Sequence, residues 1–176
     1  MCGLCGELRF DGAPVQADVI ETMKQQLVKR GPDSEGFWAG DPAAPNIALG
    51  HRRLSIIDLS DRAAQPMLDA QADVALVFNG TIYNYPELRE ELQGLGHSFR
   101  SSGDTEVILR AYIQWGEDAI QRLQGMFAIA IWDGTKKRLL LARDRNGIKP
   151  LYYSHTGDRL MFASNTQALI HADRRA

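Results

Sequence analysis

Cysteine is scarce in this sequence, since only Cys2 and Cys5 occur among its 176 residues. A disulfide-rich scaffold is therefore excluded, and in a reducing compartment both side chains are expected to be thiols. Long hydrophobic runs are also missing, because no apolar stretch approaches the roughly 20 residues that span a bilayer. No basic segment leads into an apolar stretch at the N-terminus, so we expect no secretory signal, no membrane partner and a cytoplasmic location.

An excess of positive charge is the third absence. Lys and Arg total 20 and Asp and Glu total 22, which gives a formal net charge of −2. Proteins that track nucleic-acid phosphates normally carry a basic excess on one face, so we expect no nucleic-acid partner. The hydrophobic share of 44% is ordinary for a globular protein. A chain of this length can bury enough surface to fold as one domain without a disulfide or a metal.

The hydrophobic pattern predicts an early strand, three helices and a final series of strands. The expected strands cover residues 1–11, 74–78, 126–132, 138–142, 151–153 and 160–163, and the expected helices run from Asp18 to about Arg30, from Pro86 to Gly94 and from about Asp104 to Trp115. Asp18 can cap the first helix with Glu21 reaching back to it. Asn79-Gly80 is a typical turn that would end the strand at Phe78, and residues 39–46 are expected as a loop. This order predicts a mixed α/β fold with a largely antiparallel sheet.

The segment Cys2-Gly3-Leu4-Cys5 has several chemical interpretations. A zinc site needs a second pair of ligands at motif spacing, but the four histidines are scattered singly. A thioredoxin-like redox pair should follow a strand and open a helix, and no strand can precede position 2. The simplest alternative gives Cys2 no chemical role and makes Cys5 a small buried hydrophobic residue.

The position of Cys2 suggests a further interpretation. Removal of Met1 would place a thiol and a free α-amino group on the same residue. In model peptides the α-amine titrates at about 7.7–8.0 and the thiol at about 8.5. The amine could therefore act as general base for its own side chain, without a histidine. Spacing alone does not decide among these four interpretations.

Seven motifs in a fixed order then make the sequence recognisable. They are Met1-Cys2-Gly3, Arg30-Gly31-Pro32-Asp33, His51-Arg52-Arg53-Leu54-Ser55-Ile56, Asn79-Gly80-Thr81-Ile82-Tyr83-Asn84, Ser102-Gly103-Asp104-Thr105-Glu106-Val107, Gln124-Gly125-Met126-Phe127-Ala128 and the run from Arg143 to Tyr152. Together they resemble the glutaminase domain of class II glutamine amidotransferases, which are N-terminal-nucleophile hydrolases. Within this family the sequence as a whole resembles the asparagine synthetase B branch. Its opening residues and Asn79-Gly80-Thr81-Ile82 are more similar to the related enzyme that amidates N-acetylglutaminylglutamine.

This resemblance implies a reaction in which glutamine and water give glutamate and ammonia through a γ-glutamyl thioester. It implies that Cys2 is the nucleophile, with its α-amine as proton shuttle. The Asn79 side-chain amide and the Gly80 backbone N–H would form the oxyanion hole. Arg53 would bind the substrate α-carboxylate and Asp104 the α-ammonium.

The same resemblance supplies the remaining site residues. The substrate-binding set is completed by Leu54, Ser55, Ile56, Ile57 and Thr81. The residues from Arg30 to Asp33 would form a loop beside the nucleophile. Thr81 stands where asparagine synthetases usually have Glu, so Asp104 would carry the countercharge alone. Cys5 is expected to be a packing residue, and we expect no metal site.

The resemblance also implies a fold and an organisation of the longer protein. The fold class is α+β, a four-layer αββα sandwich of two antiparallel sheets, over a glutaminase domain of residues 2–170 with residues 171–176 as a tail. No phosphate-binding loop occurs. We therefore expect no cofactor in this domain, with ATP and Mg²⁺ only in a missing C-terminal ATP-pyrophosphatase synthetase domain. The expected partners are L-glutamine, that domain and, in a homodimer, a second copy. A degenerate domain that only senses glutamine is the alternative, and the presence of Cys2 and Asn79 favours the enzyme.

Overall fold

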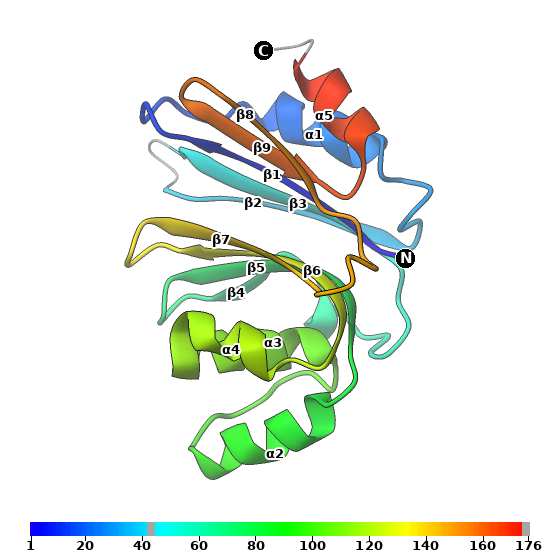
Figure 1. Ribbon diagram of the computed structural model, residues 1–176, viewed down its shortest axis with the longest axis vertical. Helices are drawn as coiled ribbons and strands as arrows, with labels where there is room; N and C mark the ends of the chain where they lie inside the picture. The colour runs from blue at the N-terminus through cyan, green and yellow to red at the C-terminus, as the bar shows by residue number, and fades with distance from the viewer. Residues whose placement is uncertain (42–44, 174–176) are drawn as a thin grey trace. The chain divides into compact units, whose positions relative to one another are not determined.

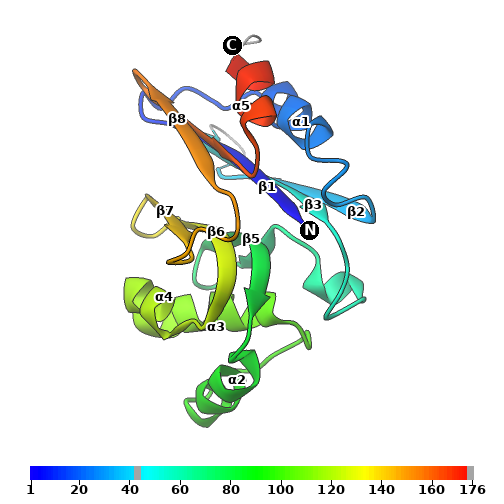
Figure 2. The same cartoon turned by 45° about the vertical axis from the view of Figure 1, so that its right-hand side comes forward.

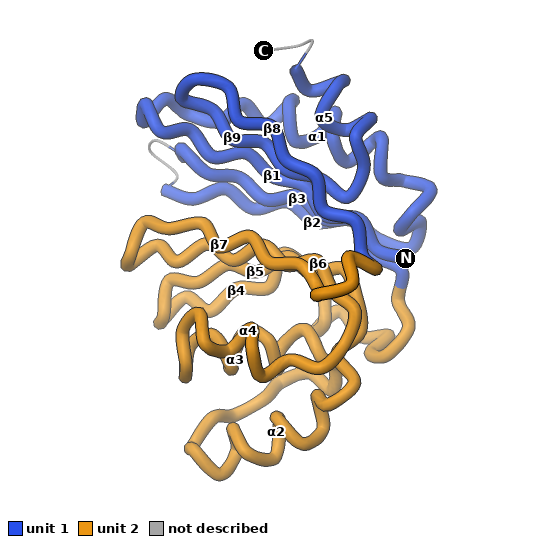
Figure 3. Tube along the Cα trace, in the orientation of Figure 1, with its two compact units in different colours: residues 1–54, 149–176 blue, residues 55–148 orange. Residues whose placement is uncertain are grey.

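The computed structural model describes residues 1–41 and 45–173 and divides the chain into two compact units. The first unit contains residues 1–54 and 149–176, and the second contains residues 55–148 (Figure 3). Each unit has its own antiparallel sheet. The two ends of the chain therefore belong to the same unit, and a continuous segment between them forms the other.

The sheet of the first unit has five strands in the order β2-β3-β1-β9-β8. Its elements are β1 (Gly3–Arg9), α1 (Ala17–Gln25), β2 (Ser34–Ala39), β3 (Ile47–Arg53), β8 (Tyr152–Thr156), β9 (Arg159–Ala163) and α5 (Thr166–Asp173). Helices α1 and α5 lie side by side over one face of this sheet (Figures 1 and 2). Cys5, Ala48 and Ala163 pack against them in one hydrophobic cluster. Strand β1 lies at the centre and is paired on both sides.

The sheet of the second unit has four strands in the order β4-β5-β6-β7. Its elements are β4 (Met67–Asp69), β5 (Val74–Ile82), α2 (Tyr85–Gly94), α3 (Asp104–Trp115), α4 (Ala119–Arg122), β6 (Gly125–Asp133), β7 (Arg138–Arg143) and two short 3₁₀ turns at Asp61–Ala63 and Gly116–Asp118. Leu76 and Phe78 of β5 pack with Ile129 of β6 and with Val107 and Ile108 of α3. This face of the sheet is therefore the core of the unit.

Most of the predicted elements are confirmed, and so is the predicted α+β class with two antiparallel sheets. The helices predicted from Pro86 and Asp104 are α2 and α3, and the predicted late strands are β6 to β9. Strands β2, β3 and β4 and helices α4 and α5 were not predicted. The predicted domain boundary at residue 170 falls inside α5, and residues 42–44 of the predicted loop and 174–176 of the predicted tail lie outside the described residues. No helix in the described part is long and apolar enough to cross a membrane.

The predicted turn at Asn79-Gly80 is wrong, because β5 continues through both residues to Ile82. Gly80 lies opposite Phe127 of β6, and a Cβ atom there would lie 2.2 Å from the Met126 carbonyl oxygen. The glycine is therefore required by the close approach of two strands, and its φ is not positive. Pairing with a long neighbouring strand outweighs the local turn preference of the Asn-Gly dipeptide.

The predicted capping of α1 is also wrong. The N-cap residue is Gln16, without a side-chain cap, and Asp18 lies in the first helical turn. Glu21 bonds forward along the helix instead, since its carboxylate accepts a hydrogen bond from Gln25 and pairs with Lys24 at 2.7 Å. The helix ends at Gln25 and the chain continues in turns toward Arg30, so the prediction placed this end too late.

Candidate functional site

Cys2 immediately precedes β1 in the first unit. Gly3 pairs with Arg52, so the register continued by one residue places Cys2 opposite Arg53. The Cys2 Sγ atom accepts a hydrogen bond from the Leu54 N–H at 3.3 Å and lies 3.6 Å from the Leu54 carbonyl oxygen. The thiol is thus positioned by main-chain atoms of a strand end, while the residue remains partly exposed.

The loop that follows α1 lies beside this cysteine, as the sequence predicted. The Arg30 Nε atom donates to the Cys2 carbonyl oxygen at 3.1 Å. Gly31 allows the loop to approach β3 closely, since a Cβ atom there would lie 2.3 Å from the Arg52 carbonyl carbon. Burial lowers the pKa of Arg30. Arg30 therefore holds the main chain of Cys2, whereas the thiol is hydrogen-bonded by the main chain of Leu54.

Cys5 occupies a different environment from Cys2. It is fully buried against α1, and burial raises the pKa of its thiol to about 12. Successive residues of a strand point to opposite faces, so Cys2 and Cys5 lie on opposite sides of the sheet. That arrangement contradicts a shared zinc ion and a redox pair. Across residues 1–41 and 45–173, no three His, Cys, Asp or Glu side chains gather at metal-binding distances.

Arg53 is the last residue of β3 and is 7% exposed. Ala48 belongs to the cluster under α1 and α5, so strand alternation places Arg53 on the opposite face, the face of Cys2. Its neighbour Arg52 points the other way and pairs with Glu35 at 3.0 Å. The structure therefore distinguishes two adjacent arginines: Arg53 lies on the face of Cys2 and Arg52 does not.

Asn79 of β5 carries a buried amide group in the second unit. It is 1% exposed, and its Nδ2 atom has no hydrogen-bond partner among the described residues. Its neighbours Phe78 and Leu76 belong to the core under the helices at alternate positions, so Asn79 lies on the helix-free face of the sheet. An amide donor left unpaired in the interior costs about 1–3 kcal/mol. A buried donor of this kind needs an explanation, and a ligand that it binds is one.

The main-chain N–H of the next residue, Gly80, makes no hydrogen bond to the neighbouring strand β6. The N–H of Phe127 donates to the Asp144 carboxylate at 3.2 Å, and its carbonyl accepts from the Asp144 N–H at 2.9 Å. Since N–H and C=O of a strand residue point to the same side, neither is available to Gly80 across the β5–β6 pair. The Gly80 N–H faces the other edge, where β4 pairs only with residues 74–76. At this end of β5, the Asn79 Nδ2 atom therefore has no partner among the described residues, and the Gly80 N–H has none in the sheet.

Asp104 begins α3, and its carboxylate lies against the end of the same strand. Its Oδ2 atom accepts a hydrogen bond from the Ile82 N–H at 3.0 Å. The residue is 5% exposed, and burial raises the pKa of its carboxyl group. No cationic side chain in the described part of the chain pairs with it. A buried carboxylate without a countercharge is costly, and a cationic group of a ligand would remove that cost.

The structure thus gathers the predicted site residues in two groups. Cys2, Arg53 and Leu54 lie together in the first unit, and Asn79, Gly80, Thr81 and Asp104 lie at one end of β5 in the second. Ser55, Ile56 and Ile57 form the loop that begins the second unit, in which Ile56 is 73% exposed. Sequence reasoning missed the contacts of Arg30 with Cys2 and of Leu54 with the thiol, because they depend on strand pairing.

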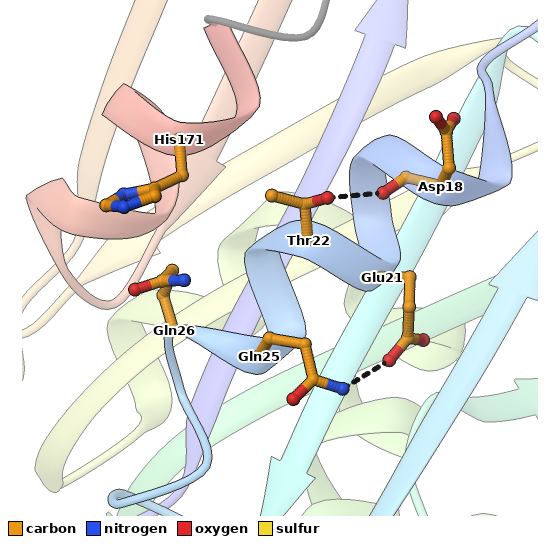
Figure 4. Close-up of a pocket in the computed structure, with 6 residues that line it drawn as sticks. All are labelled: Asp18, Glu21, Thr22, Gln25, Gln26 and His171. Atoms are coloured by element: carbon orange, nitrogen blue, oxygen red, sulfur yellow. Dashed lines mark hydrogen bonds between the residues drawn. The ribbon is translucent and has the colours of Figure 1, made fainter.

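A pocket elsewhere in the first unit contains none of these residues. It has a volume of about 320 Å³ and is lined by Asp18, Glu21, Thr22, Gln25, Gln26 and His171 (Figure 4). The Thr22 hydroxyl donates to the Asp18 carbonyl oxygen at 2.8 Å, and the Gln25 amide donates to Glu21 at 2.8 Å. The hydrogen bonds of Thr22 and Gln25 are thus made within α1 itself. The pocket has no group of residues that suggests catalysis.

Comparison with known proteins indicates a family. Residues 1–175 match the model of a glutamine amidotransferase domain. The chain is 38% identical over 180 residues to asparagine synthetase [glutamine-hydrolyzing] 3 of Bacillus subtilis (strain 168), covering 100% of this chain and 28% of that protein. It is 42% identical over 177 residues to asparagine synthetase [glutamine-hydrolyzing] 1 of the same organism, covering 98% of this chain and 27% of that one. The chain therefore spans little more than a quarter of the length of these curated relatives.

A solved structure shows the same fold at lower sequence identity. Glutamine phosphoribosylpyrophosphate amidotransferase from B. subtilis, complexed with ADP and GMP, matches with a TM-score of 0.81 and 23% identity, covering 98% of this chain and 44% of that one. The similarity extends over almost all of the present chain. It confirms the predicted fold class.

Proposed function

This chain belongs to the glutamine amidotransferase domain family, and from that premise we propose that Cys2 attacks L-glutamine and releases glutamate and ammonia. The observation that carries the proposal is the buried, unpartnered Nδ2 of Asn79 beside the open N–H of Gly80. Amide hydrolysis develops a negative charge on the carbonyl oxygen, and preorganised donors stabilise that charge in the transition state. Two such donors on consecutive residues are suited to this task.

We propose the following sequence of bonds. After Met1 is removed, the Cys2 thiol transfers its proton to its own α-amine, and the sulfur attacks the γ-carbonyl carbon of glutamine. The oxyanion is stabilised by Asn79 and Gly80. Collapse breaks the C–N bond, and the proton from the α-amine accompanies the nitrogen as ammonia. Water then attacks the thioester with the α-amine as base, which releases glutamate and restores the thiol.

The remaining charged residues are suited to the zwitterionic end of glutamine. The Arg53 guanidinium, on the face of Cys2, would bind the α-carboxylate with its planar donors. The Asp104 carboxylate, buried without a countercharge, would bind the α-ammonium. Thr81 offers a hydroxyl rather than a second carboxylate. Recognition of the ammonium therefore depends chiefly on Asp104.

The length of the relatives extends this proposal to the whole protein. The matched asparagine synthetases are more than three times as long as this chain, which covers 28% and 27% of them. We propose that the ammonia passes to an ATP-dependent synthetase domain of a longer protein, where ATP and Mg²⁺ would bind. A homodimer is part of the same proposal.

The chain should hydrolyse L-glutamine without a metal. The proposed steps need only a thiol, an amine and hydrogen-bond donors. After dialysis against a strong chelator, the protein should release glutamate and ammonia in equal amounts at the rate of the untreated sample. Glutamate and ammonia should both be measured over time. The intact mass of the purified protein should show that Met1 has been removed. A stoichiometric zinc content on which activity depends would contradict this mechanism.

Arg53→Ala should lower kcat/KM for L-glutamine by about 30- to 3,000-fold, since losing the buried partner of a charge costs about 2–5 kcal/mol. The loss should shrink with 4-aminobutanamide, which is glutamine without its α-carboxylate. Asp104→Asn should behave in the same way toward 4-carbamoylbutanoate, which lacks the α-amine. Steady-state kinetics with these three substrates check both roles. Equal losses of Arg53→Ala on glutamine and 4-aminobutanamide would exclude the carboxylate role.

A further inference from the structure

The turn that carries Asp104 is held by charged side chains from three separate segments. Glu106 of α3 is fully buried, and its carboxylate accepts hydrogen bonds from the main-chain N–H groups of Arg100 and Ser101 at 2.7–3.2 Å. Asp58 accepts from the Ser102 N–H at 2.8 Å. The N–H groups of three successive residues are therefore held by two carboxylates.

The carbonyl groups of the same turn are held by one cation, Arg89 of α2. Its Nη1 atom donates to the Ser101 carbonyl oxygen at 2.9 Å, and its Nη2 atom donates to that of Gly103 at 2.8 Å. The guanidinium carbon also lies 4.3 Å from the centre of the Phe99 ring, which packs against the core. Stacking fixes the plane of the guanidinium, and its fork then fixes two carbonyls on either side of Ser102.

We propose that Arg89 is the positioning residue for Asp104 and thereby for the α-ammonium of glutamine. Gly103 is the N-cap of α3 and Asp104 is its first residue, so a shift of the Gly103 peptide moves the carboxylate directly. Arg89 itself does not touch substrate in this mechanism. The inference rests on the proposed role of Asp104 as the group that binds the ammonium.

An anion-binding site is the competing interpretation of the same region. A pocket of about 540 Å³ there is lined by Arg62, Arg89 and Arg100, together with serine residues. Arg89 and Arg100 both already donate to main-chain carbonyls, the latter to Leu68 at 3.0 Å. The serine hydroxyls of the pocket donate to Asp58 or Glu106. Since Arg89, Arg100 and the serine hydroxyls already donate within the protein, the arrangement favours a clamp on the turn.

Arg89→Ala should lower kcat/KM for L-glutamine by about 10- to 100-fold, mainly through KM, because small displacements of a binding group have effects of this size. The same variant should lose less than about 3-fold with 4-carbamoylbutanoate, since that substrate has no ammonium for Asp104 to bind. Arg89→Lys keeps a cation near Phe99 but lacks the planar fork that reaches both carbonyls in fixed geometry, so its loss should be intermediate. Thermal unfolding of both variants separates a kinetic effect from a loss of fold.

The control is Arg122→Ala in the same unit. Arg122 also stacks on an aromatic ring, 3.8 Å from the centre of Trp115, and pairs with Glu91 at 2.8 Å, but its side chain does not hold the 101–103 turn. Its activity on both substrates should stay within about 2-fold of the parent chain, as for exposed pairs in general. A loss that matches that of Arg89→Ala would indicate a general effect of removing a stacked arginine and would overturn the proposal.

A double-mutant cycle completes the test. If Arg89 acts through Asp104, then Arg89→Ala should add little to the loss caused by Asp104→Asn. Additive losses, or equal losses of Arg89→Ala on both substrates, would overturn the positioning role while Asp104→Asn still discriminates between the substrates. If Asp104→Asn itself fails to discriminate between them, the proposed role of Asp104 is wrong, and the present inference fails with it.

Discussion

Cys2→Ala should abolish glutamine hydrolysis, lowering kcat by about 10⁴-fold or more to the background rate, because no covalent intermediate can then form. Cys5→Ala should keep most of the activity, since Cys5 lies on the opposite face of β1 and packs against α1. Ammonia release by the two variants, both shown by mass to have lost Met1, measures the difference. Background hydrolysis in Cys5→Ala together with normal hydrolysis in Cys2→Ala would reverse the assignment.

Chemical labelling provides an independent control for the same assignment. A diazoketone analogue of glutamine should add to Cys2 and leave Cys5 unmodified. The pKa of the Cys5 thiol is raised to about 12 by burial, so between pH 7 and 8 it stays protonated and unreactive. Peptide mapping of the labelled protein identifies the modified residue. A label on Cys5 would show that the buried environment opens in solution and would exclude the proposed nucleophile.

Asn79→Ala should lower kcat by about 10²- to 10³-fold, the typical cost of one oxyanion donor, while KM changes little. The fold should not suffer, because the Nδ2 atom that is removed has no partner among the described residues. The thermal midpoint is therefore expected to remain or to rise. This combination, a large kinetic loss without a loss of stability, distinguishes a catalytic amide from a structural one.

Asn84→Ala is the matched control for that experiment. The Asn84 amide donates to the Arg122 carbonyl oxygen at 3.0 Å, and its side-chain oxygen accepts from the Gln124 N–H at 2.9 Å. Its replacement should lower the thermal midpoint and leave kcat nearly unchanged. If Asn79→Ala loses stability instead and retains kcat, the unpartnered amide has no role in the transition state.

The spacing of apolar residues predicted those helices and strands whose buried face shows as a regular pattern within a short stretch of sequence. Helix α3 has its apolar residues at helical spacing and a glycine at each end, and the prediction placed its end correctly. Strand β3 was missed because six of its seven residues are buried, so it has no alternation of apolar and polar residues, and it contains Gly50 and two arginines. Helix α5 is short and weakly amphipathic. Such elements are determined by their neighbours rather than by their own residues.

The residue types of the candidate site were predicted from ordered motifs, and their surroundings were not. For Asn79-Gly80 the oxyanion role stays a prediction, and the predicted turn is wrong, since only the pairing of β5 with β6 shows that these residues continue a strand. The hydrogen bonds of Leu54 with Cys2 join residues 52 positions apart. The hydrogen bonds from Arg89 to the Ser101 and Gly103 carbonyl oxygens depend on the packing of α2 against α3. None of these contacts has a signal in a local window.

The pairing of β1 with β9 has a consequence for the order of folding. Cys5 pairs with Ala163, and the Ser164 hydroxyl accepts a hydrogen bond from the Leu4 N–H across 160 positions of sequence. Contacts this distant form late, because closing so long a loop costs entropy before any pairing offsets it. During synthesis, residues 55–148 leave the ribosome as one continuous segment, whereas β1 cannot pair with β9 until residues 159–163 have also been made. Strand β1, which directly follows Cys2, is therefore made long before its partner β9, and its full set of main-chain partners exists only once β9 has been synthesised.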